Sequence, residues 1–237
     1  MINKKEILAI IPARGGSKGL PGKNIKLLNE KPLIAHTILE AKNSRYINRI
    51  IVSTDDNAIA EIANQWGAEV PFMRCANLAT DESKSNDVIL DVLKWLKEND
   101  NYIPDYIMLL QCTSPLRESK HIDEAIDLLF ENSADAIVSV KECEENPYWM
   151  KILVDNKIKS FINSNNAILR RQELPNIYSL NGAIYMTKTQ FFLEHKDWYG
   201  DNTIAYIMDK ESSIDVDDIL DFKLAELILN LRGGENE

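Results

Sequence analysis

The stretch EILAIIPARGGSKGLPGKN, residues 6–24, decides the fold, because an apolar run of strand length passes directly into a glycine-rich loop. The run stops at Pro12, and Gly16, Gly19 and Gly22 follow at a spacing of three. A continuous apolar run bounded by turn residues is typical of a buried parallel strand. Ligands of open parallel sheets bind at the carboxyl ends of the strands. The stretch therefore predicts an α/β sheet and a binding loop at its edge.

Basic side chains are concentrated in this loop, although the protein of 237 residues carries a net charge of −10. Arg14, Lys18, Lys23 and Lys26 lie between residues 7 and 29, a segment that contains no Asp or Glu. Glycines let backbone N–H groups approach an anion closely, and an arginine can bind a phosphate with two hydrogen bonds. The loop therefore predicts a polyphosphate site.

Two common phosphate-binding loops do not fit this stretch. The motif GxGxxG is absent, because Ser17 follows Gly15 and Gly16 where a further glycine is needed. A Walker A loop would need a glycine at Ser17 and a Ser or Thr at Asn24. A dehydrogenase and a P-loop kinase are therefore disfavoured. A pyrophosphorylase type of loop remains, in which cations neutralise a nucleoside triphosphate and its leaving pyrophosphate.

Strand and helix signals alternate along the chain, which predicts right-handed βαβ units and a mainly parallel sheet. The predicted strands are 6–12, 49–56, 68–74, 105–111, 135–141, 181–188 and 203–209. The predicted helices are 31–44, 57–67, 85–100, 118–133, 189–195 and 217–232. The alternation stops at about Glu142, and residues 142–180 predict an inserted β-rich arm. Residues 1–141 and 181–237 are then the core.

The composition excludes several classes of protein. Hydrophobic residues make up 45% of the chain, enough for one sizeable core. The acidic balance argues against a nucleic-acid scaffold, so no nucleic-acid partner is expected. No segment has the roughly 18–20 apolar residues that cross a bilayer, so no membrane association is expected. Three cysteines without a CxxC motif favour a reducing compartment, so we predict a cytoplasmic protein.

Several motifs occur together in order: ARGGSKGLPGKN, FMRCANLATDESKS, LLQCTSPLR, LNGAIY and SIDVDDILD. With these motifs the chain resembles the acylneuraminate cytidylyltransferases, or CMP-sialic acid synthetases, nearly from end to end. The resemblance implies transfer of CMP from CTP to the anomeric hydroxyl of a nine-carbon acidic sugar, with Mg²⁺ as cofactor and pyrophosphate as product. It also implies a Rossmann-like nucleotidyltransferase core with an inserted dimerisation arm, and hence a homodimer.

The resemblance assigns roles to individual residues. Those implied to bind the nucleotide are Arg14, Ser17, Lys18, Lys23, Asn24, Arg74, Ala79, Ser85 and Gln111. Those implied to bind the sugar are Gln111, Arg171, Asn181, Gly182 and Tyr185, with Arg171 on the arm reaching the sugar across the dimer. Asp215 and Asp217 are implied to hold Mg²⁺. Arg14, Lys23 and Asp217 are the predicted catalytic residues.

The chemistry of the acidic residues supports this assignment. Asp215 and Asp217 are two residues apart, and on an extended segment they project to the same side. Carboxylate oxygens suit Mg²⁺. The alternative is that Asp217 only caps the following helix, a role for which Asp218 is the better candidate. A further acidic pair, Asp55 and Asp56, is expected to cap the helix after it, with a place at the rim of the site as the alternative. Arg117 is expected to pair with acids on its own helix.

Two alternatives stay open. Relatives often carry an arginine where this chain has Ser179 and Leu180, so the sugar could be legionaminic acid or another nonulosonic acid. From a different class, a non-catalytic nucleotide-binding protein could use the same fold. The pair Asp215 and Asp217 argues against that class, because a sensor has no need of a metal at the α-phosphate.

Overall fold

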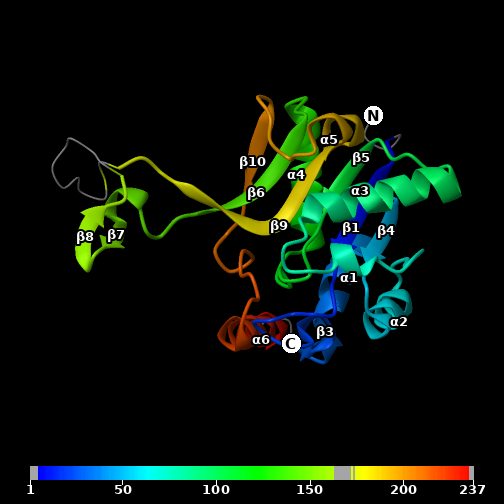
Figure 1. Ribbon diagram of the computed structural model, residues 1–237, viewed down its shortest axis with the longest axis horizontal. Helices are drawn as coiled ribbons and strands as arrows, with labels where there is room; N and C mark the ends of the chain where they lie inside the picture. Colours follow the sequence, from blue (N-terminus) through cyan, green and yellow to red (C-terminus); the bar gives the residue numbers. More distant parts are fainter. Residues whose placement is uncertain (1–4, 163–171, 173, 235–237) are drawn as a thin grey trace.

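A six-stranded sheet forms the centre of the molecule (Figure 1). The computed structural model describes residues 5–162, 172 and 174–234. The strand order is β10-β6-β9-β5-β1-β4, in which β9 is antiparallel to both of its neighbours and the remaining pairs are parallel. The strands are β1 (Ile7–Pro12), β4 (Arg49–Ser53), β5 (Tyr106–Leu109), β6 (Ala136–Glu142), β9 (Tyr178–Lys188) and β10 (Thr203–Ile207). The predicted α/β class with a mainly parallel sheet is confirmed.

Helices cover both faces of the sheet. The helices are α1 (Leu33–Asn43), α2 (Asn57–Trp66), α3 (Ser85–Trp95, continued by a π-helical turn Leu96–Asp100), α4 (Ser119–Glu131), α5 (Thr189–His195) and α6 (Ile219–Gly234). Side chains of β1 alternate between two hydrophobic clusters: Ile7 and Ile11 pack with α1, α2 and α4, whereas Leu8 and Ile10 pack with α3 and α5. Strand β1 is therefore buried on both sides, as its unbroken apolar sequence predicts.

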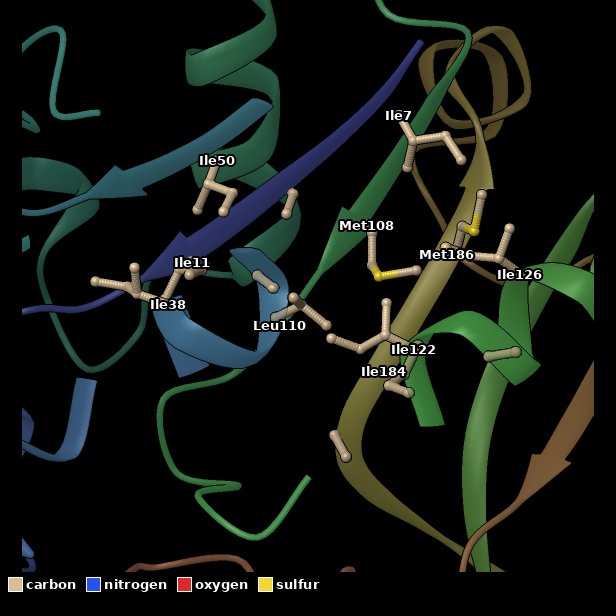
Figure 2. Packing of buried hydrophobic residues seen from close by; sticks show 14 of the residues in the cluster. Ile7, Ile11, Ile38, Ile50, Met108, Leu110, Ile122, Ile126, Ile184 and Met186 are labelled. Atoms are coloured by element: carbon tan, nitrogen blue, oxygen red, sulfur yellow. The ribbon is translucent and has the colours of Figure 1, made fainter. Parts of the chain in front are cut away.

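The first of these clusters joins distant parts of the chain (Figure 2). Ile11 of β1 lies beside Ile38 of α1, and Ile122 of α4 lies beside Ile184 of β9. Burying such side chains contributes roughly 1.5–3 kcal/mol each. This packing fixes where each strand ends, and the candidate site lies at those ends.

Residues 68–74 do not form the predicted strand. Only a single parallel bridge joins Glu69 to Ile51. Pro71 has no N–H to donate, which prevents a continued ladder. The chain nevertheless runs along the sheet edge, because the Arg74 N–H donates to the carbonyl of Thr54 at 2.8 Å.

A hairpin projects from the core, at the left of Figure 1. It consists of β7 (Lys151–Val154) and β8 (Lys157–Ser160), which pair only with each other. Strands β6 and β9 lead to it and still pair at Glu142 and Tyr178. The hairpin lies within residues 142–180, where the alternation of helix and strand signals stops. Its assignment as a dimerisation arm stays a prediction.

The remaining short elements surround the start of α1. Strands β2 (Leu27–Leu28) and β3 (Lys31–Pro32) form a small hairpin, and α6 packs beside it. Among the helices in the described part of the chain, none has both the length and the apolar character needed to cross a bilayer.

Candidate active site

The glycine-rich loop directly follows β1 and is held by hydrogen bonds from both sides. The Gly15 N–H donates to Oδ1 of Asp55, at the end of β4, at 3.0 Å. The buried Asn24 donates from Nδ2 to the carbonyl of Arg14 at 2.9 Å. Gly22 has φ +66, a left-handed conformation that glycine adopts without strain. The loop is therefore shaped before any ligand arrives.

A cavity of about 410 Å³ opens between this loop, the end of β5 and the segment before α6. Its lining residues are Pro12, Arg14, Ser17, Lys18, Gly19, Lys23, Asn24, Ser85, Gln111, Cys112, Thr113 and Asp217. Most of the residues predicted to bind the nucleotide thus meet at one place, although they come from three separate parts of the chain. The sequence had singled out neither Thr113 nor Cys112 as a site residue.

Lys23 links the two ends of the chain. Its Nζ donates to the carbonyl of Val216 at 2.8 Å and lies 3.2 Å from Oδ1 of Asp217. The side chain is only 14% exposed, so the ammonium is fixed in place. The cavity holds an oriented cation directly beside an acidic residue of the predicted metal pair.

Gly19 explains why a glycine is needed at this point of the loop. A Cβ added there would lie 2.4 Å from the backbone oxygen of Asp217, closer than real Cβ contacts. The loop backbone therefore packs directly on the backbone of the acidic segment. Only a residue without a side chain allows this approach.

Asp81 pairs with two of the cations that the sequence predicts to bind the nucleotide. Its carboxylate lies 2.6 Å from Nη2 of Arg14 and also forms an ion pair with Lys18. Hydrogen bonds from Lys18 and Arg14 hold the pKa of Asp81 below its usual range. No pattern in the sequence marked Asp81, because the pairing joins the loop after β1 to the loop before α3.

The acids near the start of α6 differ in their hydrogen bonding, as Asp215 and Asp218 show. Oδ1 of Asp215 is buried and has no hydrogen-bond partner among the described residues. Burial, and secondarily the nearby Asp217, raise the pKa of Asp215, while a hydrogen bond with Thr113 opposes the rise. Asp218 caps the helix, since its Oδ1 accepts from the N–H groups of Leu220 and Asp221. The expectation that Asp218 is the cap is confirmed.

The orphaned oxygen of Asp215 is the observation that tests a metal here. Mg²⁺ prefers carboxylate oxygens and retains several waters, so two carboxylates beside a phosphate site suit it. Within the described ranges, no three His, Cys, Asp or Glu side chains gather as a metal-binding group. Asp215 and Asp217 therefore fit Mg²⁺ only together with further oxygens, such as those of phosphates.

A second cavity, of about 250 Å³, adjoins the first through Pro12, Arg14 and Ser85. Arg74 lines it, and its buried guanidinium donates to Oγ of Ser53 at 3.1 Å and to the carbonyl of Ser53. Burial lowers the pKa of Arg74. Ala79 lies between Leu78 and Thr80, which both line this cavity. The space has room for a planar base next to the first cavity.

The residues predicted to bind the sugar differ in exposure. Gly182 has φ +77, and a Cβ there would lie 2.8 Å from Oε1 of Gln111, so the two residues are neighbours. Tyr185 is half-buried, its ring centroid 5.6 Å from that of Trp198. Arg171 lies outside the described residues.

Asn181, another residue predicted to bind the sugar, is only 4% exposed. Its Oδ1 accepts from Oγ of Ser139 at 2.6 Å, and its Nδ2 donates to Oγ of Ser213 at 2.9 Å. This amide is used within the core, so the geometry favours a role for Asn181 in shaping β9 over direct contact with a sugar.

Comparison with known proteins identifies a family for this chain. A family model described as Cytidylyltransferase matches residues 8–232. The chain belongs to this family. The CMP-N,N'-diacetyllegionaminic acid synthase of Legionella pneumophila is 38% identical over 228 residues, which are 95% of this chain and 97% of that protein.

Other relatives act on a different sugar or share only the fold. The N-acylneuraminate cytidylyltransferase of Escherichia coli is 38% identical over 94% of this chain but 52% of its own length. The solved structure of a CMP:2-keto-3-deoxy-manno-octonic acid synthetase complexed with CTP is 16% identical, with a TM-score of 0.71 over 96% of this chain and 99% of that one. This cytidylyltransferase therefore has the fold of that synthetase.

Proposed function

We propose that the protein transfers CMP from CTP to the anomeric hydroxyl of a nine-carbon acidic sugar and releases pyrophosphate. The observation that carries the proposal is the 410 Å³ cavity lined by Arg14, Lys18, Lys23 and Asp217, in which Nζ of Lys23 lies 3.2 Å from Oδ1 of Asp217. Cations on one wall suit a triphosphate, and the acidic pair suits Mg²⁺. A protein that only bound nucleotides would not need this pair.

The chain's own residues would act on the triphosphate by position and charge. Arg14 and Lys18 would exchange the carboxylate of Asp81 for phosphate oxygens. The ammonium of Lys23 is oriented by its hydrogen bond to the carbonyl of Val216. It would stabilise the negative charge that develops on the phosphate oxygens as the sugar oxygen attacks the α-phosphorus and pyrophosphate leaves. Preorganised groups of this kind typically contribute ~10²–10³-fold in rate.

Asp215 and Asp217 would hold the cofactor Mg²⁺, supported by the orphaned oxygen of Asp215. When bound, the ion would offset the negative charge of the phosphates. Gln111 and Gly182 would separate the nucleotide side from the sugar side, because both lie where β5 and β9 end their pairing.

The native sugar is the finer part of the proposal. Sialic acid and a legionaminic acid are both candidates, since relatives that are equally identical to this chain are named for each. The legionaminic acid synthase matches over nearly its full length, and this chain has Ser179 and Leu180 where the resemblance to the sialic acid type leads us to expect an arginine. These two observations are the reason to test a legionaminic acid beside sialic acid.

One assay tests the reaction and ranks the sugars. The purified protein is incubated with each NTP, Mg²⁺ and a panel of nonulosonic acids, and pyrophosphate is measured. We expect release that needs both CTP and a sugar, with highest kcat/KM for a sialic or legionaminic acid. The proposal would be contradicted if no sugar of the panel caused pyrophosphate release, or if every NTP gave equal release.

We also propose that the protein is a homodimer formed through the β7–β8 hairpin. Leu153 and Ile158 are cross-strand partners and are 74% and 71% exposed. A two-stranded hairpin is marginally stable in water unless its apolar face is covered. In light scattering, Leu153→Glu should shift the mass toward that of a monomer, whereas Lys159→Glu on the same hairpin should not. A wild-type monomer would contradict the proposal.

A further inference from the structure

Arg117 is buried in an unusual way. It is 1% exposed, and Nη1 donates to the carbonyl of Gln111 at 3.2 Å and to that of Ala183 at 2.9 Å. The expectation that Arg117 pairs with acids on its own helix is therefore wrong. Its guanidinium instead donates to backbone oxygens of two other segments.

This arrangement is unfavourable for stability alone. Nε and Nη2 of Arg117 are buried and have no hydrogen-bond partner in the part of the chain that the structure describes. Burial lowers the pKa of Arg117 to about 10, which shows how poorly the charge is compensated. Replacing buried charges by apolar side chains of similar volume is often neutral or stabilising. Unfavourable features of this kind persist where a functional site needs them.

The two carbonyls lie where the ladder between β5 and β9 has ended. The last pair of that ladder is Leu109 with Tyr185. In the same register, Gln111 would face Ala183, and the guanidinium of Arg117 bridges these two residues in place of a direct bond. The side chain of Gln111 lies against Gly182, so the bridge fixes Gln111 relative to β9 at the proposed boundary between the nucleotide and the sugar.

We propose that Arg117 is a positioning residue that holds Gln111 against β9, at the sugar side of the site, by bridging the carbonyls of Gln111 and Ala183. This inference rests on the proposed function. The triphosphate side is held separately, by Lys23 with Val216 and by the close approach of Gly19 to Asp217. Loss of the bridge should therefore weaken binding of the sugar more than binding of CTP.

The test compares Arg117→Met, Arg117→Lys and the control Leu129→Ala. Leu129 is 1% exposed on α4 in the main hydrophobic cluster, so its truncation should destabilise the protein without touching the cavity. We expect Arg117→Met to raise KM for the sugar at least tenfold and to change the Kd of CTP less than twofold. Arg117→Lys should lie between the wild type and Arg117→Met, because an ammonium can still donate to these carbonyls. Leu129→Ala should lower only Tm.

Hydrogen exchange gives a readout that does not depend on turnover. Amides of residues 110–113 and 181–185 should exchange faster than the rest of the sheet in Arg117→Met, or in Arg117→Lys if the methionine variant does not fold, whereas Leu129→Ala should speed exchange of the core amides in general without singling out these two segments. Equal rises in the sugar KM and the CTP Kd, or unchanged local exchange, would overturn the inference. A wild type inactive on every sugar would instead refute the proposed function, while the exchange data would still decide the bridge.

Discussion

Replacing Gly19 by alanine should reduce turnover about 100-fold while leaving the protein folded. The added Cβ would lie 2.4 Å from the backbone oxygen of Asp217, and the two atoms would have to separate by about 1 Å to reach ordinary contact. The Cβ is rigidly attached to the backbone of the loop and its neighbour is a backbone oxygen, so no side-chain rotation can relieve the contact. The glycine-rich loop and the Asp217 segment must therefore move apart.

The size of the effect follows from that displacement. A misplacement of about 1 Å between catalytic groups can cost about 100-fold in rate, which corresponds to ~2.7 kcal/mol of activation free energy. Stability should change less, because overpacking typically costs about 1–3 kcal/mol and this loop lies at the surface.

Gly16→Ala is the matched control, because no atom lies within 4 Å of a Cβ added at that position. Pyrophosphate release with saturating CTP and sugar gives kcat for both variants, and thermal unfolding gives Tm. The reasoning is refuted if Gly19→Ala keeps wild-type kcat, or if Gly16→Ala loses as much.

Three further predictions address the charges and the pH dependence. Lys23→Met should lower kcat about 10²–10³-fold in the same assay, with little change in Tm; near-normal turnover would remove Lys23 from the mechanism. Asp81→Asn should lower KM for CTP by no more than about fivefold, because exposed ion pairs contribute little, and Glu82→Gln should leave it unchanged; a higher KM would show that Asp81 assists binding. Burial lowers the pKa of His36, so the folded state stays neutral while the unfolded state takes up a proton as the pH falls below about 6.5. Acid should therefore reduce the free energy of unfolding, by at most about 1.4 kcal/mol per pH unit from this residue, and His36→Gln should flatten the slope in thermal melts between pH 7.5 and 5.5.

Much of the architecture could be read from local patterns. The apolar run of β1 and the cap at Asp56, whose Oδ1 accepts from the N–H groups of Ala58 and Ile59, are confirmed. Residues 68–74 show the limit of the method, since their apolar composition resembles a strand but Pro71 prevents the ladder. An apolar composition predicts that a segment is buried. Whether the segment also forms a strand depends on which neighbouring strand its backbone can pair with.

The sequence by itself determined the chemistry of the glycine-rich loop: its cations, its lack of acids and the flexibility of its backbone all lie within a few consecutive residues. Only the tertiary structure decided what those cations face. Lys23 and Asp217 are 194 residues apart, yet their side chains meet because β1 and the segment before α6 end at the same edge of the sheet. The bridge made by Arg117 depends likewise on tertiary structure, because it joins Gln111, just after β5, to Ala183 of β9. The relative placement of these two strands is set by packing between elements.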